Sequence, residues 1–331
     1  MRKYFIVILY FFCIGNVTNS YGGEVKANYY LNINSKGALF AIYLNGIKVD
    51  DRMSESHQSI SIPLNIAMKT EDNELEVVFS PVIGRDGGKY DFLIGPKESF
   101  YMNLSLERVG FKNRDREKVT LLNVSYDMQE EKIVTSNTFN GQDVLYTSEN
   151  IKVLEKIKYR ESKRLYNPYA RPFEAFSVTS SFNTKDWFPS FIWEDSQRLE
   201  VNETLKNELR EAYNKLYRTI DDNNYNGFLG YMSDLWVFTA ECLGLDGLQG
   251  YLSSISLDKN NLRSPGDGTT LAPLNIPKDN DDFHVEILGN GKLATTLPTP
   301  IKWAKPNGKG SILKVAFYKD KNDEWRVGAV F

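Results

Sequence analysis

The feature that most constrains the fold is a change of hydrophobic periodicity near residue 160. Before it, short runs of β-branched and aromatic residues alternate with polar ones, as at Ile60 and Ile62. Period two is typical of strands that bury one face. Asn45-Gly46, placed between two such runs, is a strong hairpin signal. We therefore predict an all-β sandwich over residues 21–160.

The predicted strands of this region cover residues 28–34, 38–49, 59–66, 74–82, 100–109, 119–126 and 151–159. Residues 43–81 hold a strand–Asn-Gly–strand unit followed by an Asn-x-Leu-x-Val segment. This rhythm resembles that of jelly-roll or immunoglobulin-like accessory modules. The resemblance implies a two-sheet β-sandwich that binds sugars or proteins, and it assigns no residue to a binding site.

Helical periodicity appears in the second half of the chain. Residues 202–220 carry apolar residues on one helical face, and Asn202 is a good N-cap. Residues 225–244 are apolar nearly all round, which predicts a largely buried helix with Gly244 as its C-cap.

Strands are predicted after these helices, over residues 275–288, 292–305, 310–320 and 324–331. Helices followed by strands indicate an α+β domain, which we place at residues 181–331. The terminal segment with Trp325, Arg326, Val327 and Val330 resembles the last strand of the nuclear-transport-factor-2-like or cystatin-like fold. That resemblance implies a curved sheet wrapped around a helix.

The two predicted domains are joined by a segment rich in proline and basic residues. Pro168 and Pro172 interrupt residues 161–180, which also hold a run of Lys and Arg. This composition is typical of a linker, and we predict a junction there. A basic docking strip is the alternative.

The N-terminus has the three parts of a secretory signal peptide. Arg2 and Lys3 precede an apolar run, and Thr18 and Ser20 are small residues suited to a cleavage site. Residues 1–20 are therefore predicted to be a cleavable leader. We expect a periplasmic or secreted protein with no membrane span after cleavage. An uncleaved anchor is the alternative, although the apolar run is short for one.

Charge and cysteine usage narrow the choice of partner and fold. The formal net charge of −3 offers no footprint for nucleic acid. Beyond the predicted leader only Cys242 remains, so an intramolecular disulfide is excluded and a packed core must hold the fold. The apolar neighbours of Cys242 predict a buried structural thiol.

One stretch, residues 181–195, stands out for recognition, and we call it the aromatic stretch. Aromatic anchors rimmed by charge are typical of protein interfaces and sugar platforms. A core between the two domains is the alternative role. The predicted binding residues are Lys185, Asp186, Trp187, Phe188, Phe191 and Trp193.

A metal or general-base role is considered for His284 with Asp282. A polar turn leading into a strand is the favoured interpretation, because no second histidine or spaced carboxylate accompanies them. Nucleophile elbows, zincin helices and phosphate loops are missing from the sequence. We therefore predict no cofactor and no catalytic residue.

These observations favour a non-enzymatic binding protein. The first hypothesis is a protein of the immunity or inhibitor type, which neutralises a toxin aimed at the cell envelope. The second is a carbohydrate- or envelope-binding accessory protein. The third is an enzyme built on the cone fold, with an acid–base pair in its cup.

Overall fold

The computed structural model describes residues 25–54, 56–86, 89–92, 100–127, 129–130, 132–136, 148–162, 175–255, 257–264, 268–305 and 310–331. The predicted leader, residues 1–20, lies outside these ranges. Contacts group the described residues into two compact units, which meet in the sequence at Pro189 and Ser190. We call the part before this point the sandwich unit and the part after it the helical unit. The predicted domain bounds, residues 21–160 and 181–331, stay a prediction.

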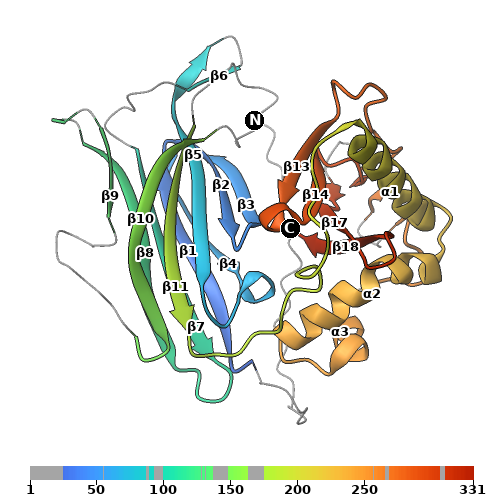
Figure 1. The fold of residues 1–331 in the computed structure, drawn as a ribbon, viewed down its shortest axis with the longest axis horizontal. Helices are drawn as coiled ribbons and strands as arrows, with labels where there is room; N and C mark the ends of the chain where they lie inside the picture. Colours follow the sequence, from blue (N-terminus) through green and yellow to red (C-terminus); the bar gives the residue numbers. More distant parts are fainter. Residues whose placement is uncertain are drawn as a thin grey trace. The chain divides into compact units, whose positions relative to one another are not determined.

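Two antiparallel sheets form the sandwich unit and face each other across a shared core (Figure 1). The first sheet has the order β4-β1-β7-β8-β9, with β1 Ala27–Lys36, β4 Gln58–Pro63, β7 Tyr101–Gly110, β8 Arg116–Asp127 and β9 Lys132–Ser136. The second has the order β10-β11-β5-β2-β3, with β2 Ala38–Leu44, β3 Ile47–Ser54, β5 Asn73–Asp86, β10 Ile151–Ser162 and β11 Ala175–Thr184. β6 (Lys89–Phe92) pairs with β5, and the short helix η1 (Asn65–Ala67) follows β4.

The predicted alternation explains how the first sheet closes over the core. Every second side chain of β1 is buried, including Leu31 and Ile33, while the intervening ones remain partly exposed. In the second sheet Phe40 and Ile42 of β2 are fully buried. Strand β2 is buried on both of its faces. Burying the apolar side chains of the two sheets removes apolar area from water and is the main favourable term for this unit.

The predicted hairpin at Asn45-Gly46 is confirmed. Both residues have positive φ values, 54° and 78°, as a type I′ turn requires. The Asn45 amide nitrogen donates to the Ala67 carbonyl at 2.8 Å, and its oxygen accepts from the Glu74 backbone at 3.0 Å. The turn is therefore tied to the chain that links β4 with β5.

Part of the predicted junction is a strand. Residues 175–180 belong to β11, which pairs with both β10 and β5, and residues 161–162 end β10. Residues 163–174 lie outside the described ranges. The prolines and charges indicated a linker. The Ser and Thr residues at alternate positions of β11 did not give the apolar pattern by which the other strands were predicted. Ser177 and Ser180 are buried because they hydrogen-bond to Glu76 and to the Leu121 carbonyl.

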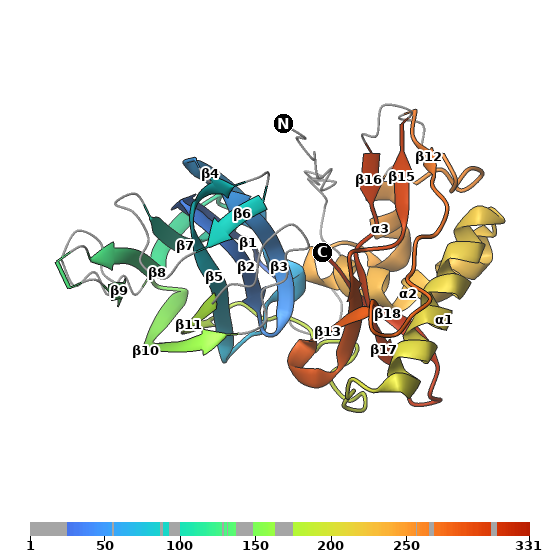
Figure 2. The same cartoon turned by 90° about the horizontal axis from the view of Figure 1, so that it is seen from above.

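Helices packed on an antiparallel sheet form the helical unit (Figure 2). The helices are α1 Glu203–Asp221, α2 Tyr225–Cys242 and α3 Gly247–Ser254. The main sheet has the order β13-β14-β17-β18, with β13 His284–Leu288, β14 Leu293–Leu297, β17 Val315–Lys319 and β18 Trp325–Val330. A smaller sheet is made of β12 Thr270–Leu271, β15 Lys302–Ala304 and β16 Gly310–Ile312. The short helix η2 (Gly289–Gly291) joins β13 to β14.

Helix α1 has the predicted cap and packs on the main sheet. The Asn202 side chain accepts a hydrogen bond from the Leu205 backbone at 2.8 Å. Fully buried Tyr213 stands edge-on to Phe317 of β17, with ring centroids 4.9 Å apart, and donates to the Val315 carbonyl at 2.9 Å. The expected helix-on-sheet arrangement is confirmed for this part of the chain.

The strands of this unit are shorter than predicted. Residues 275–283 are not a strand, since β13 begins at His284, and the predicted strand 292–305 divides into β14 and β15. The segment 310–320 likewise divides into β16 and β17. In the first case the polar run of Asp and Asn residues makes turns instead. The whole described chain is a sheet-rich α+β fold.

None of the helices in the described part of the chain combines the length and apolar character that a membrane crossing requires.

Candidate functional site

The aromatic stretch divides between the two units, and most of its predicted binding residues are buried. Phe188, in the sandwich unit, is 4% exposed and packs edge-on against Tyr29. Phe191 and Trp193, in the helical unit, are also 4% exposed and stack on each other with centroids 4.6 Å apart. These three rings each pack inside their own unit.

Asp186 is buried as well, whereas Lys185 is exposed and Trp187 is half-buried. A binding role for the six predicted residues stays a prediction. Because the other four are buried, only Lys185 and Trp187 of this set present a side chain that a partner could contact.

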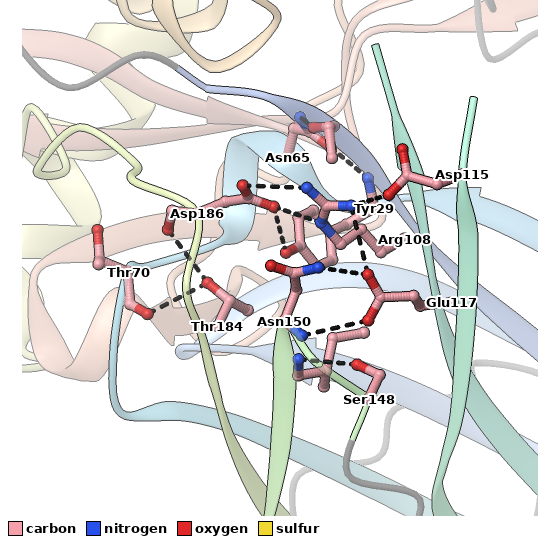
Figure 3. Close-up of polar contacts among 12 residues, drawn as sticks. Tyr29, Asn65, Thr70, Arg108, Asp115, Glu117, Ser148, Asn150, Thr184 and Asp186 are labelled. Atoms are coloured by element: carbon pink, nitrogen blue, oxygen red, sulfur yellow. Dashed lines mark hydrogen bonds and ion pairs between the residues drawn. The ribbon is translucent and has the colours of Figure 1, made fainter. Parts of the chain in front are cut away.

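Asp186 joins a polar cluster with side chains of β1, β7 and β8 (Figure 3). Its carboxylate accepts two hydrogen bonds from Arg108 of β7, at 2.7 and 3.3 Å, and one from the Tyr29 hydroxyl at 2.7 Å. Arg108 also contacts Asp115 at 2.8 Å and Glu117 at 3.5 Å. These contacts attach the segment that follows β11 to strands β1, β7 and β8.

The electrostatics of this cluster favour fixed protonation states. Burial, together with the hydrogen bond and charge of Asp186, raises the pKa of Tyr29. Burial alone would lower the pKa of Arg108, but the hydrogen bond and charge of Asp186 outweigh it and raise that pKa. Tyr29 thus stays neutral and Arg108 stays charged. Both residues therefore stabilise the fold through their hydrogen bonds to Asp186 and are poorly suited to proton transfer.

Glu117 extends the cluster toward the start of β10. Partial burial would raise the pKa of Glu117, but hydrogen bonds from Ser148 and Asn150 and the charge of Arg108 lower it. Asn150 contacts the Glu117 carboxylate through both its backbone and its side-chain nitrogen. The fold therefore stabilises the ionised form of Glu117.

The metal or base candidates lie on the surface of the helical unit. His284 opens β13 and Asp282 precedes it, and both side chains are exposed. Across the described ranges, no three His, Cys, Asp or Glu side chains gather as a metal ion would require. Cys242 is fully buried in α2, and burial raises the pKa of its thiol, so the prediction of a buried thiol is confirmed.

A different set of residues forms the most regular surface of the sandwich unit. The outward side chains of the first sheet fall into two cross-strand rows. One row contains Ser61, Asn32, Ser105 and Thr120. The other contains Ser59, Asn34, Asn103, Asn123 and Ser136. We call these nine side chains the polar face.

The residue types of the polar face are unusual for a sheet. Asn is depleted in strands, yet Asn32, Asn34, Asn103 and Asn123 occupy four of the nine positions. Charged residues make up 25% of the chain, and none of the nine is charged. Departures from local preference of this kind are expected at functional sites.

The rows are bordered by two tyrosines and by charged residues, with Glu107 and Lys118 beside the first row and Lys36 beside the second. Tyr30 precedes the first row along β1, and Tyr101, opposite Lys36, follows the second. The Tyr101 hydroxyl lies 2.7 Å from His57 Nδ1. Glu107, beside Tyr30, accepts from the Asn32 amide at 3.0 Å and pairs with Arg116.

A β-bulge aligns the two rows on β8. The register between β7 and β8 shifts between Leu104 and Ser105, so that Thr120 and Asn123, three residues apart, point to the same side. Strict alternation would have placed these two side chains on opposite faces. This shift hid the contribution of β8 to the polar face from sequence reasoning, and the alternate Asn residues of β1 were a visible signal that was not used.

Comparisons of this chain with protein families, curated proteins and solved structures found no match.

Proposed function

We propose that this chain is a non-enzymatic binding protein of the cell envelope that recognises its partner through the polar face. The envelope location rests on the predicted leader. The binding role is supported by one observation above all, the gathering of nine uncharged hydrogen-bonding side chains on five paired strands.

The geometry of a sheet suits recognition. Backbone hydrogen bonds hold side chains on neighbouring strands about 5 Å apart. Binding therefore costs little conformational entropy. The alternative role of the polar face is simple solvation, which is common for the outer face of an antiparallel sheet. Solvation alone does not require four Asn residues, each of which disfavours the strand that carries it.

Retention on cell-envelope fragments from the organism that encodes the chain tests this proposal. The variant Asn34→Thr with Asn103→Thr removes two amides from one row and places a residue that favours strands at each position. Asn28→Thr, on β1 and the same face but outside both rows, is the matched control. We expect the parent and the control to sediment with the fragments and the double variant to stay in solution. Equal sedimentation of all three would refute a role for the polar face.

A protein partner of the immunity or inhibitor type is the second candidate, and the aromatic stretch favours it. Trp187 is half-buried, lies between the anchored residues Asp186 and Phe188, and follows exposed Lys185. A tryptophan held in this way suits an interface hot spot. Affinity purification from an envelope extract should then yield one stoichiometric protein that Trp187→Ala loses. Retention of that protein by the variant would count against this candidate.

A further inference from the structure

The polar face carries the hydrogen-bonding groups that complement hydroxyls. An Asn amide has two donors and an acceptor with two lone pairs, so it can bind two adjacent hydroxyl groups of a ligand at once. Ser and Thr hydroxyls both donate and accept. In the second row Asn34, Asn103 and Asn123 lie side by side on β1, β7 and β8, which sets three amides in line across the sheet.

The charge pattern selects a neutral ligand. None of the nine side chains of the polar face can pair with an anion or a cation. Glu107, the carboxylate nearest the rows, is engaged by Arg116 and by the Asn32 amide. Over the rows themselves a phosphate, a uronic acid or a charged peptide would lose its hydration without an ionic partner, because the nearest ammonium groups, Lys36 and Lys118, lie beyond the ends of the rows.

The borders of the rows supply apolar contact. Tyr30 and Tyr101 lie at opposite ends of the two-row array on partly exposed positions. Tyrosine presents an apolar ring with a polar tip, which suits the apolar face of a sugar ring as well as its hydroxyls. Successive strands step by about 5 Å. That step is of the same order as one hexose in an extended polysaccharide.

The second row contains a buried polar atom with unmet hydrogen-bonding capacity. The Asn34 side-chain oxygen is enclosed by its neighbours and has no hydrogen-bond partner among the described residues. Enclosed polar atoms in proteins are nearly always paired, with protein, water or a ligand. Asn34 lies in the second row between Ser59 and Asn103, and its unpaired oxygen is an observation independent of the composition of the polar face.

We propose that the polar face binds a neutral, extended polysaccharide, laid across β4, β1, β7 and β8 with its hydroxyls on the Asn, Ser and Thr rows. This inference rests on the proposed function and names the partner class of the same surface.

Affinity electrophoresis with defined polymers tests it. The purified chain is run through gels that contain dextran, mannan, xylan or mixed-linkage β-glucan as neutral probes, and alginate or polygalacturonate as anionic ones. We expect at least one neutral polymer to retard the chain, with no loss between roughly 0.05 and 0.5 M salt. Asn34→Thr with Asn103→Thr should weaken that binding roughly tenfold or more, and Asn28→Thr should not.

The other outcomes overturn the inference in distinguishable ways. If all neutral polymers fail, or only anionic ones bind and salt abolishes that binding, the partner class is wrong. If envelope retention still depends on Asn34 and Asn103, the proposed function survives, and a protein bound at the polar face becomes the partner. If a neutral polymer binds the double variant as well as the parent, both proposals fall. Unfolding curves of the variants show that any loss is not a loss of fold.

Discussion

Replacing Asp186 with Ala should strongly destabilise the sandwich unit. The Asp186 carboxylate accepts hydrogen bonds from two nitrogens of Arg108 and from the Tyr29 hydroxyl. The side chains of Arg108 and Asp186 are 8% and 5% exposed, so the substitution leaves a buried charge and a buried hydroxyl without their main acceptor. Partly exposed Asp115 remains beside Arg108 at 2.8 Å and limits the damage.

The magnitude follows from these contacts. Breaking a buried ion pair costs about 3–5 kcal/mol, and the remaining Asp115 contact places this site near the lower end. An unsatisfied buried hydroxyl adds about 1 kcal/mol. The free energy of unfolding should therefore fall by about 4 kcal/mol. For a unit of this size that loss lowers the melting temperature by roughly 8–16 °C.

Urea unfolding followed by circular dichroism measures the loss, and hydrogen exchange of β1 and β7 amides locates it in the sandwich unit. The triple variant Tyr29→Phe, Arg108→Met, Asp186→Leu is the control. It removes both partners of the ion pair together with the hydroxyl, so it should lose less stability than Asp186→Ala. A loss below about 1 kcal/mol for Asp186→Ala, or a larger loss for the triple variant, would refute the reasoning.

Three further predictions concern other contacts. Because the pKa of Glu117 is lowered in the folded chain, its carboxylate stabilises the fold above the unfolded pKa of about 4.3, and that contribution disappears as the pH falls through the folded pKa. The stability difference between the parent and Glu117→Gln should thus be about 1 kcal/mol at neutral pH and shrink as the pH falls below the unfolded pKa, and a constant difference in urea titrations would contradict this. Tyr213→Phe should cost about 1 kcal/mol in chemical denaturation, since the hydroxyl donates to a buried carbonyl while the ring packing is kept, and an unchanged midpoint would count against that bond. Asn34→Thr with Asn103→Thr should leave the melting temperature unchanged or raise it by a few degrees because Thr favours strands, and a clear fall in calorimetry would argue that the Asn residues serve the fold.

Elements that depend on local signals in the sequence were predicted correctly. The alternation of β1 and the turn at Asn45-Gly46 depend on neighbouring residues alone, and both are present in the structure. The cap at Asn202 is equally local, as is Gly244, which has a φ of 66° beyond the end of α2. Such features are set by backbone preference within a few residues.

Features that depend on pairing between distant segments were missed. β11 is a strand because it lies between β10 and β5, where Ser177 finds Glu76. Asp186 looked like a surface charge, and only the fold brings Arg108, 78 residues away, to its side. The aromatic residues around it fitted both an interface and a core between the domains, because hydrophobicity alone does not separate a core ring such as Phe188 from an exposed anchor.

The central claim is that the polar face contacts the partner. Side-chain amide NMR signals of Asn32, Asn34, Asn103 and Asn123 report on it directly, with Asn28 as the internal reference. On titration with the polymer that binds best in electrophoresis, the account predicts that the four row signals shift or broaden together while Asn28 changes little. Unchanged row signals under saturating conditions, with shifts elsewhere in the chain, would contradict it.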